Sequence, residues 1–119
     1  MAKNKSHVLF LPNLNGSGPP WMDESDRAAF VGLSLENTLG DMIRAVLEGT
    51  AFQSRVGIEL FKDLKLPISA VCSVGGGAKS PLWTEMRCDI MGKPIETLSY
   101  PESGCMGVAM LAAVATGIY

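Results

Sequence analysis

The sequence predicts an α/β domain in which strands alternate with helices. In its second half, apolar runs of strand length alternate with longer segments of helical periodicity, and a glycine-rich turn separates one strand from the helix that follows. The 119 residues are 47% hydrophobic and 18% charged, without a stretch of biased composition, which is typical of a single globular domain. Strands joined through helices pair in parallel by right-handed crossovers, so we expect packed helices on a sheet.

Two strands are expected in the first third of the chain. Residues 7–11 (HVLFL) form an uninterrupted apolar run that Pro12 closes. Residues 12–20 are rich in Asn, Gly and Pro, the residue types that supply turns, and they predict a loop. Residues 30–33 (FVGL) are short and apolar, which predicts the second strand.

A long helix is expected from Thr38 to Lys62. Thr38 is a suitable N-cap, and Asp41 follows it at the spacing of a capping box. Along this segment the polar residues recur at helical spacings and the apolar ones lie elsewhere, so we expect one solvated stripe with the remainder buried.

The second half predicts two further strands and two further helices. We expect strands over residues 68–74 and 94–98, and helices over residues 81–91 and 104–115. The last of these helices has small or apolar residues nearly all round, which predicts burial on several sides.

Charge and cysteine content exclude several classes of partner. Ten Lys and Arg against twelve Asp and Glu give a formal charge of −2, which is too balanced for electrostatic binding of nucleic acid or an anionic membrane. The three cysteines form no CxxC pair, so we expect neither a disulfide framework nor a metal site, and we expect a reducing cytoplasm. The mean hydropathy of +0.21 indicates more apolar surface than a lone domain hides, and a homodimer is one way to cover it.

The glycine turn is the candidate binding site. It lies where a strand ends and a helix begins, the position at which open α/β sheets bind ligands. Glycine permits positive φ and lets a ligand approach backbone N–H groups, so phosphate or nucleotide is the expected guest. The alternative is that these glycines only turn the chain. The candidate cofactor-binding residues are Gly75, Gly76, Gly77, Ala78, Lys79 and Ser80.

Two known phosphate-binding motifs do not match this turn. A P-loop requires Gly immediately before the Lys and another Gly five residues earlier, where this chain has Ala78 and Ser73. A dinucleotide fingerprint starting at Gly75 requires Gly or Ala at its last position, where this chain has Ser80.

Four stretches together resemble the carboxy-terminal domain of the FGGY carbohydrate kinases, which include xylulokinases and glycerol kinases. FLPNLNGSGPPW (residues 10–21) is similar to the family's loop FLPYLxGERxPxW. AAFVGL (28–33), with DMIRAVLE (41–48) seven residues later, is similar to the second family signature. GGGAKSPLW (75–83) is similar to the family's adenosine loop, and residues 102–119 to its closing helix. This chain departs from the pattern at Ser17 and Gly18, where many members carry Glu-Arg, and at Ala28.

The resemblance implies a partial ribonuclease H-like (actin-like ATPase) domain with a mixed sheet. It also implies ATP and Mg²⁺ as cofactors, a sugar or polyol as substrate, and an amino-terminal kinase domain as partner. Residues 1–119 would be part of the nucleotide-side domain, truncated at both ends. The family's catalytic aspartate has no counterpart here, so we assign no catalytic residue and expect the isolated chain to be inactive. The alternative is a non-catalytic module of ribonuclease H-like fold that binds nucleotide or protein.

Overall fold

The computed structural model describes residues 7–98 and 102–118. The elements follow one another in the expected order, with strands shorter than the apolar runs that predicted them. They are β1 (Leu9–Leu11), β2 (Ala29–Val31), α1 (Leu39–Asp63), β3 (Val71–Ser73), the 3₁₀ turn η1 (Gly76–Lys79), α2 (Pro81–Met91), β4 (Ile95–Thr97) and α3 (Ser103–Ala115).

The strands form two small sheets of opposite type. β1 and β2 pair antiparallel, and the rings of the directly opposed Phe10 and Phe30 lie 4.7 Å apart between centroids. β3 and β4 pair in parallel, with α2 as the connection between them. Parallel and antiparallel pairing are thus both present, as the family resemblance implies, but in separate two-stranded sheets.

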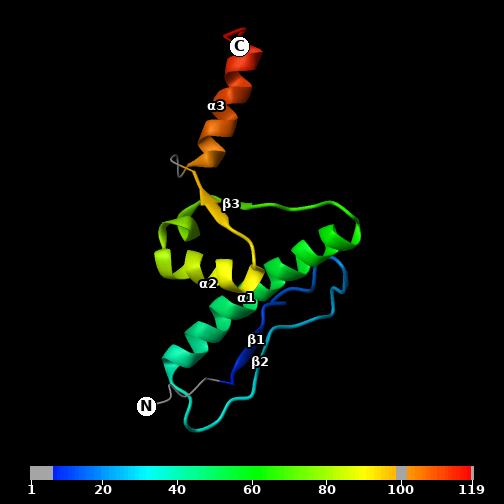
Figure 1. Cartoon of the computed structure of the whole chain (residues 1–119), viewed down its shortest axis with the longest axis vertical. Helices are drawn as coiled ribbons and strands as arrows, with labels where there is room; N and C mark the ends of the chain where they lie inside the picture. The colour runs from blue at the N-terminus through cyan, green and yellow to red at the C-terminus, as the bar shows by residue number, and fades with distance from the viewer. Residues whose placement is uncertain (1–6, 99–101, 119) are drawn as a thin grey trace.

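Helix α1 organises the body of the molecule, because it contacts β1 on one side and α2 on another (Figure 1). It begins with the expected capping box: the Thr38 hydroxyl accepts from the Asp41 amide, and the Asp41 carboxylate accepts from the Thr38 amide at 2.8 Å. Gly49 is buried where α1 crosses β1, and a Cβ there would clash with the Phe10 carbonyl group. The absence of a side chain at this crossing allows the close approach of helix and strand.

The core is small, and the expected burial of α1 is only partly correct. The buried apolar side chains of the described residues are Val8, Ala45, Ala51 and Met91. Ile43 and Phe52 on α1 remain about half exposed, although the periodicity predicts their burial. The difference arises because β1 and α2 cover only part of the circumference of α1.

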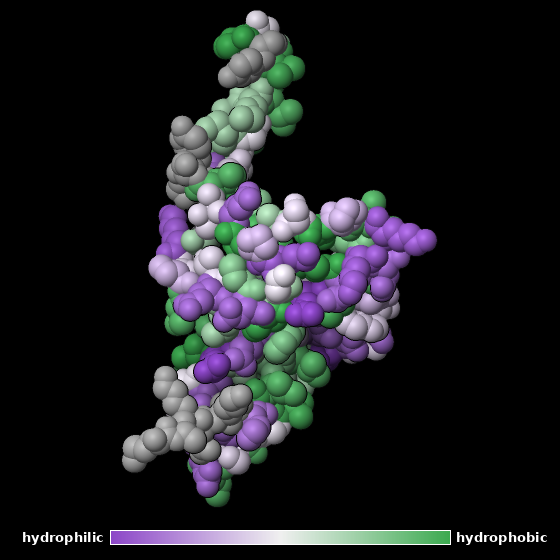
Figure 2. Space-filling model, viewed as in Figure 1, coloured by the Kyte–Doolittle hydropathy of each residue, from purple (hydrophilic) through white to green (hydrophobic). Residues whose placement is uncertain are grey.

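The last helix forms where it is predicted, but its predicted burial is wrong. α3 was expected to be buried on several sides, but it extends away from the body as an arm (Figure 1), and none of its residues is buried. Leu111 is 72% exposed and Val114 62%, and Figure 2 shows this arm as mostly hydrophobic surface. The apolar composition is as predicted, but no other helix or strand of the described chain packs along α3. That a second copy covers such surface stays a prediction.

Among residues 7–98 and 102–118, no helix combines the length and the apolar character that crossing a membrane requires.

Candidate functional site: the glycine turn

The glycine turn lies at the carboxyl end of β3 and leads into α2. Gly75 has φ 82° and ψ −169°, a conformation essentially restricted to glycine. The chain then makes the 3₁₀ turn η1, and Ser80 returns to an extended conformation before α2 begins at Pro81. The structure therefore places all six candidate residues, 75–80, in one continuous turn between strand and helix.

The space around the first two glycines is open. A Cβ on Gly75 or Gly76 would meet no described atom within 4 Å, whereas one on Gly77 would lie 3.3 Å from Nε1 of Trp83. The backbone of Gly75 and Gly76 is therefore accessible, while Gly77 packs against the indole of α2.

A hollow of about 110 Å³ adjoins the turn. It is lined by Ser73, Val74, Gly75, Ala78, Lys79, Thr97 and Leu98, so the ends of both β3 and β4 contribute to it. Sites for small molecules usually enclose about 300–1,000 Å³. The hollow is smaller than such sites, so the described residues alone do not enclose a small molecule here.

Ser80 caps helix α2 and keeps a donor free. Its Oγ accepts from the Trp83 amide at 3.3 Å, which satisfies one of the amides at the start of the helix. A hydroxyl that accepts in this way can still donate its own proton. Lys79 is exposed and forms no ion pair with any residue in the described ranges.

Arg87 fixes the end of β3 to α2 directly behind the turn. Its Nη1 donates to Oγ of the buried Ser73 at 2.9 Å, and its guanidinium carbon lies 5.6 Å from the centroid of the Trp83 ring. Arg87 is not among the site residues that the sequence predicts. The signal was available, because Trp83 and Arg87 are four residues apart on a helix and therefore share a face.

The loop between β1 and β2 is held by hydrogen bonds of its own. Arg27 Nη1 donates to the carbonyl oxygens of Glu24 at 2.8 Å and Asp26 at 2.6 Å. The Ser25 hydroxyl and amide donate to the Asp23 carboxylate, at 2.6 and 2.8 Å, and these bonds hold the pKa of Asp23 below its ordinary value. No group of three His, Cys, Asp or Glu side chains able to hold a metal ion occurs among the described residues.

Comparison with known proteins identifies the chain's relatives. Residues 1–116 match the model of the FGGY family of carbohydrate kinases, C-terminal domain. The chain belongs to the FGGY family. It is 36% identical to a xylulose kinase of Staphylococcus epidermidis over 110 aligned residues. The alignment covers 92% of this chain and 22% of that kinase.

Solved FGGY kinases show the same fold. A ligand-bound xylulose kinase from Lactobacillus acidophilus superposes with a TM-score of 0.75 and 34% identity over 94% of this chain and 23% of that one. Plasmodium falciparum glycerol kinase with ADP superposes with a TM-score of 0.78 and 28% identity over 96% of this chain and 23% of that one. The predicted family and its actin-like ATPase fold are thus confirmed, and the chain spans about a fifth of the length of these relatives.

Proposed function

We propose that this chain is the nucleotide-side part of an ATP-dependent kinase that transfers the γ-phosphate to a hydroxyl of a pentulose, hexulose or polyol. The observation that carries the proposal is the open glycine turn at residues 75–80 in a chain of the FGGY family. Relatives named as xylulose and glycerol kinases support this substrate class, and the relative solved with ADP supports the nucleotide.

Four residues of the turn, Gly75, Gly76, Lys79 and Ser80, have a role that their geometry supports. Gly75 and Gly76 present bare backbone, which lets a purine or ribose approach N–H groups that a side chain would shield. The Ser80 hydroxyl keeps a proton that it can donate to a ribose oxygen. We expect the exposed Lys79 to face a phosphate, and Arg87 to position the turn from behind without touching the ligand.

The chain supplies residues that bind and orient the nucleotide, but it does not supply the general base of the reaction. In the complete reaction, Mg²⁺-bound ATP supplies the phosphoryl group, and catalysis rests on alignment and on stabilising negative charge. We assign the base that accepts the sugar proton to an amino-terminal kinase domain. Loss of a general base alone lowers a rate about 10²–10⁴-fold. The isolated chain should therefore produce no detectable ADP from ATP in the presence of D-xylulose or glycerol, and steady sugar phosphorylation by the purified chain would contradict this assignment.

Calorimetric titration with ADP tests the binding role of the turn. Gly76→Val is the decisive variant, because the backbone φ of Gly76 is not positive and no atom occupies the space beside it. A valine there fits the free protein and fills only the space that we assign to the ligand. Gly18→Val is the matched control, because Gly18 also has open space and no positive φ but lies in the β1–β2 loop.

We expect weak binding by the wild-type chain, because the opposing domain that would close over the nucleotide is not part of it. Gly76→Val should abolish the binding heat, and Gly18→Val should leave it unchanged. Equal affinities in all three proteins would remove the glycine turn from the proposed function.

A further inference from the structure

A second and larger hollow lies at the other end of the β3–β4 sheet. Its volume is about 570 Å³, within the range of small-molecule sites. The last turns of α1, the residues that lead into β3 and the residues between α2 and β4 form its walls. Because β3 runs from Val71 to Ser73, this hollow precedes the strand while the glycine turn follows it. The two sites are therefore at opposite ends of the strand.

Positive charge is concentrated in this hollow. The described residues contain eight Lys and Arg, and four of them line it: Arg55, Lys62, Lys65 and Lys93. The only carboxylate in the lining is Glu59, so the lining carries a formal charge of +3 in a chain whose net charge is −2. Asp63 lines the neighbouring hollow and not this one.

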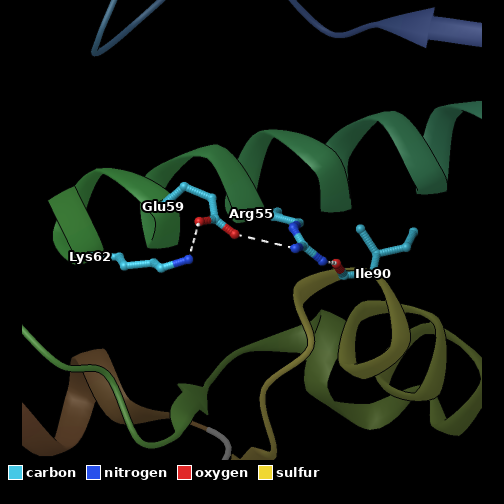
Figure 3. Close-up of polar contacts among 4 residues, drawn as sticks. All are labelled: Arg55, Glu59, Lys62 and Ile90. Atoms are coloured by element: carbon cyan, nitrogen blue, oxygen red, sulfur yellow. Dashed lines mark hydrogen bonds and ion pairs between the residues drawn. The ribbon is translucent and has the colours of Figure 1, made fainter.

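Two of the four cations are paired with the single carboxylate of the lining. Glu59 accepts from Arg55 Nη2 at 3.2 Å and lies 3.6 Å from Lys62 Nζ, and Arg55 Nη1 donates to the Ile90 carbonyl at 2.8 Å (Figure 3). This network holds the last turns of α1 against the end of α2. Lys65 and Lys93 form no ion pair with any described residue, so their charge is available to a ligand.

The backbone at Lys65 supports a role for its side chain. Lys65 has φ 60° directly after α1, and the Leu66 amide closes the turn by donating to the Phe61 carbonyl at 2.9 Å. Glycine is the preferred residue at such a left-handed position. Fold stability alone would favour glycine here, whereas the chain places a cation at the rim of the hollow.

The floor of the hollow is apolar. Met91 is buried, and Ile58 and Ile68 are half-buried beside it. The carboxyl ends of α1 and α2 add about half a negative charge each, which offsets only part of the positive charge of the lining. We propose that this hollow binds a small organic anion whose apolar body rests on Met91 and Ile68 and whose charged group lies between Lys65 and Lys93.

The test uses two probes with the same apolar body, 2-naphthyl phosphate and uncharged 2-naphthol. Titrations of the ¹⁵N-labelled chain are followed by amide chemical shifts. We expect the phosphate to bind with its largest shifts at residues 58–68 and 91–93, and to bind more weakly as salt is raised, because exposed charges are screened. 2-Naphthol should bind at least tenfold more weakly. Equal affinity for both probes, or no binding of the phosphate, would overturn the proposal.

Three variants that each replace a lysine with glutamate test whether the probe binds in this hollow or elsewhere on the surface. Lys65→Glu and Lys93→Glu should each weaken binding of 2-naphthyl phosphate roughly fivefold, as expected for an exposed charge contact that changes sign. Lys79→Glu in the glycine turn should leave it unchanged. If Lys79→Glu alone lowers the affinity, the probe binds at the glycine turn and the proposal is wrong.

Lys65→Gly distinguishes charge from folding. It relieves the left-handed backbone at this position, so the variant should be at least as stable as the parent chain, and yet it should bind 2-naphthyl phosphate more weakly. Unchanged affinity in this variant would contradict the assignment of Lys65.

Discussion

The crossing of α1 over β1 should tolerate no side chain at Gly49. An added Cβ would lie 3.1 Å from the Phe10 carbonyl carbon and much closer to its oxygen, so helix and strand must separate. In an unobstructed helix Gly→Ala stabilises by about 1 kcal/mol. Forcing a methyl group into a packed contact costs about 1–3 kcal/mol, and the cost here lies at the upper end, about 2–3 kcal/mol, because the obstacle is backbone rather than a flexible side chain. We therefore expect Gly49→Ala to lower the free energy of unfolding by about 1–2 kcal/mol.

Gly57 on the same helix is the matched control. A Cβ there meets nothing within 4 Å, so Gly57→Ala should raise the free energy of unfolding by about 1 kcal/mol. The two variants should differ by about 2–3 kcal/mol, or roughly 10 °C in melting temperature for a domain of this size. Urea unfolding followed by circular dichroism measures the difference. Equal stabilisation by both substitutions would refute the close approach of α1 and β1.

Three further outcomes follow from single contacts. Thr38→Ala removes the cap of α1 and should cost about 1 kcal/mol in urea unfolding, whereas Thr50→Ala in the same helix should cost less than half of that. Arg87→Ala leaves the buried Ser73 hydroxyl without its donor and should lower the free energy of unfolding by about 1–3 kcal/mol. The same change should cost little in a chain that already carries Ser73→Ala. Additive costs of the two substitutions in this double-mutant cycle would contradict the contact. The folded-state pKa of Asp23 is lowered, so its carboxylate should contribute its full stability above its ordinary pKa, and this contribution should be lost as the pH falls through the lower folded-state pKa. An NMR titration of Asp23 that gives the ordinary pKa would contradict the hydrogen bonds from Ser25.

Local sequence signals predict the elements of this fold well. The α1 cap follows from Thr38 and Asp41, and the bounds expected for α2 agree with the structure because Ser80 and Pro81 start the helix and Gly92 ends it in a left-handed conformation. Strand lengths were overestimated, because an apolar run shows where a strand can form but not how many residues find a hydrogen-bonding partner.

Tertiary burial was predicted less well, and α3 shows why. Its composition indicates that the helix can be buried, but composition does not identify the surface that covers it. The same limit applies to the two proposed binding sites. The glycine turn was recognisable from neighbouring residues, whereas the cationic hollow joins Lys65 to Lys93 across 28 positions of sequence and depends on the packing of α1 against α2.

The location of bound ADP tests the central claim most directly. Amide shifts of the ¹⁵N-labelled chain titrated with ADP would report at once on every residue except the prolines, which have no amide proton. The account predicts that the largest changes fall on residues 73–80 and on the end of β4 at residues 97–98. Changes confined to the hollow at residues 58–68 and 91–93, or spread evenly along the chain, would contradict a nucleotide site at the glycine turn.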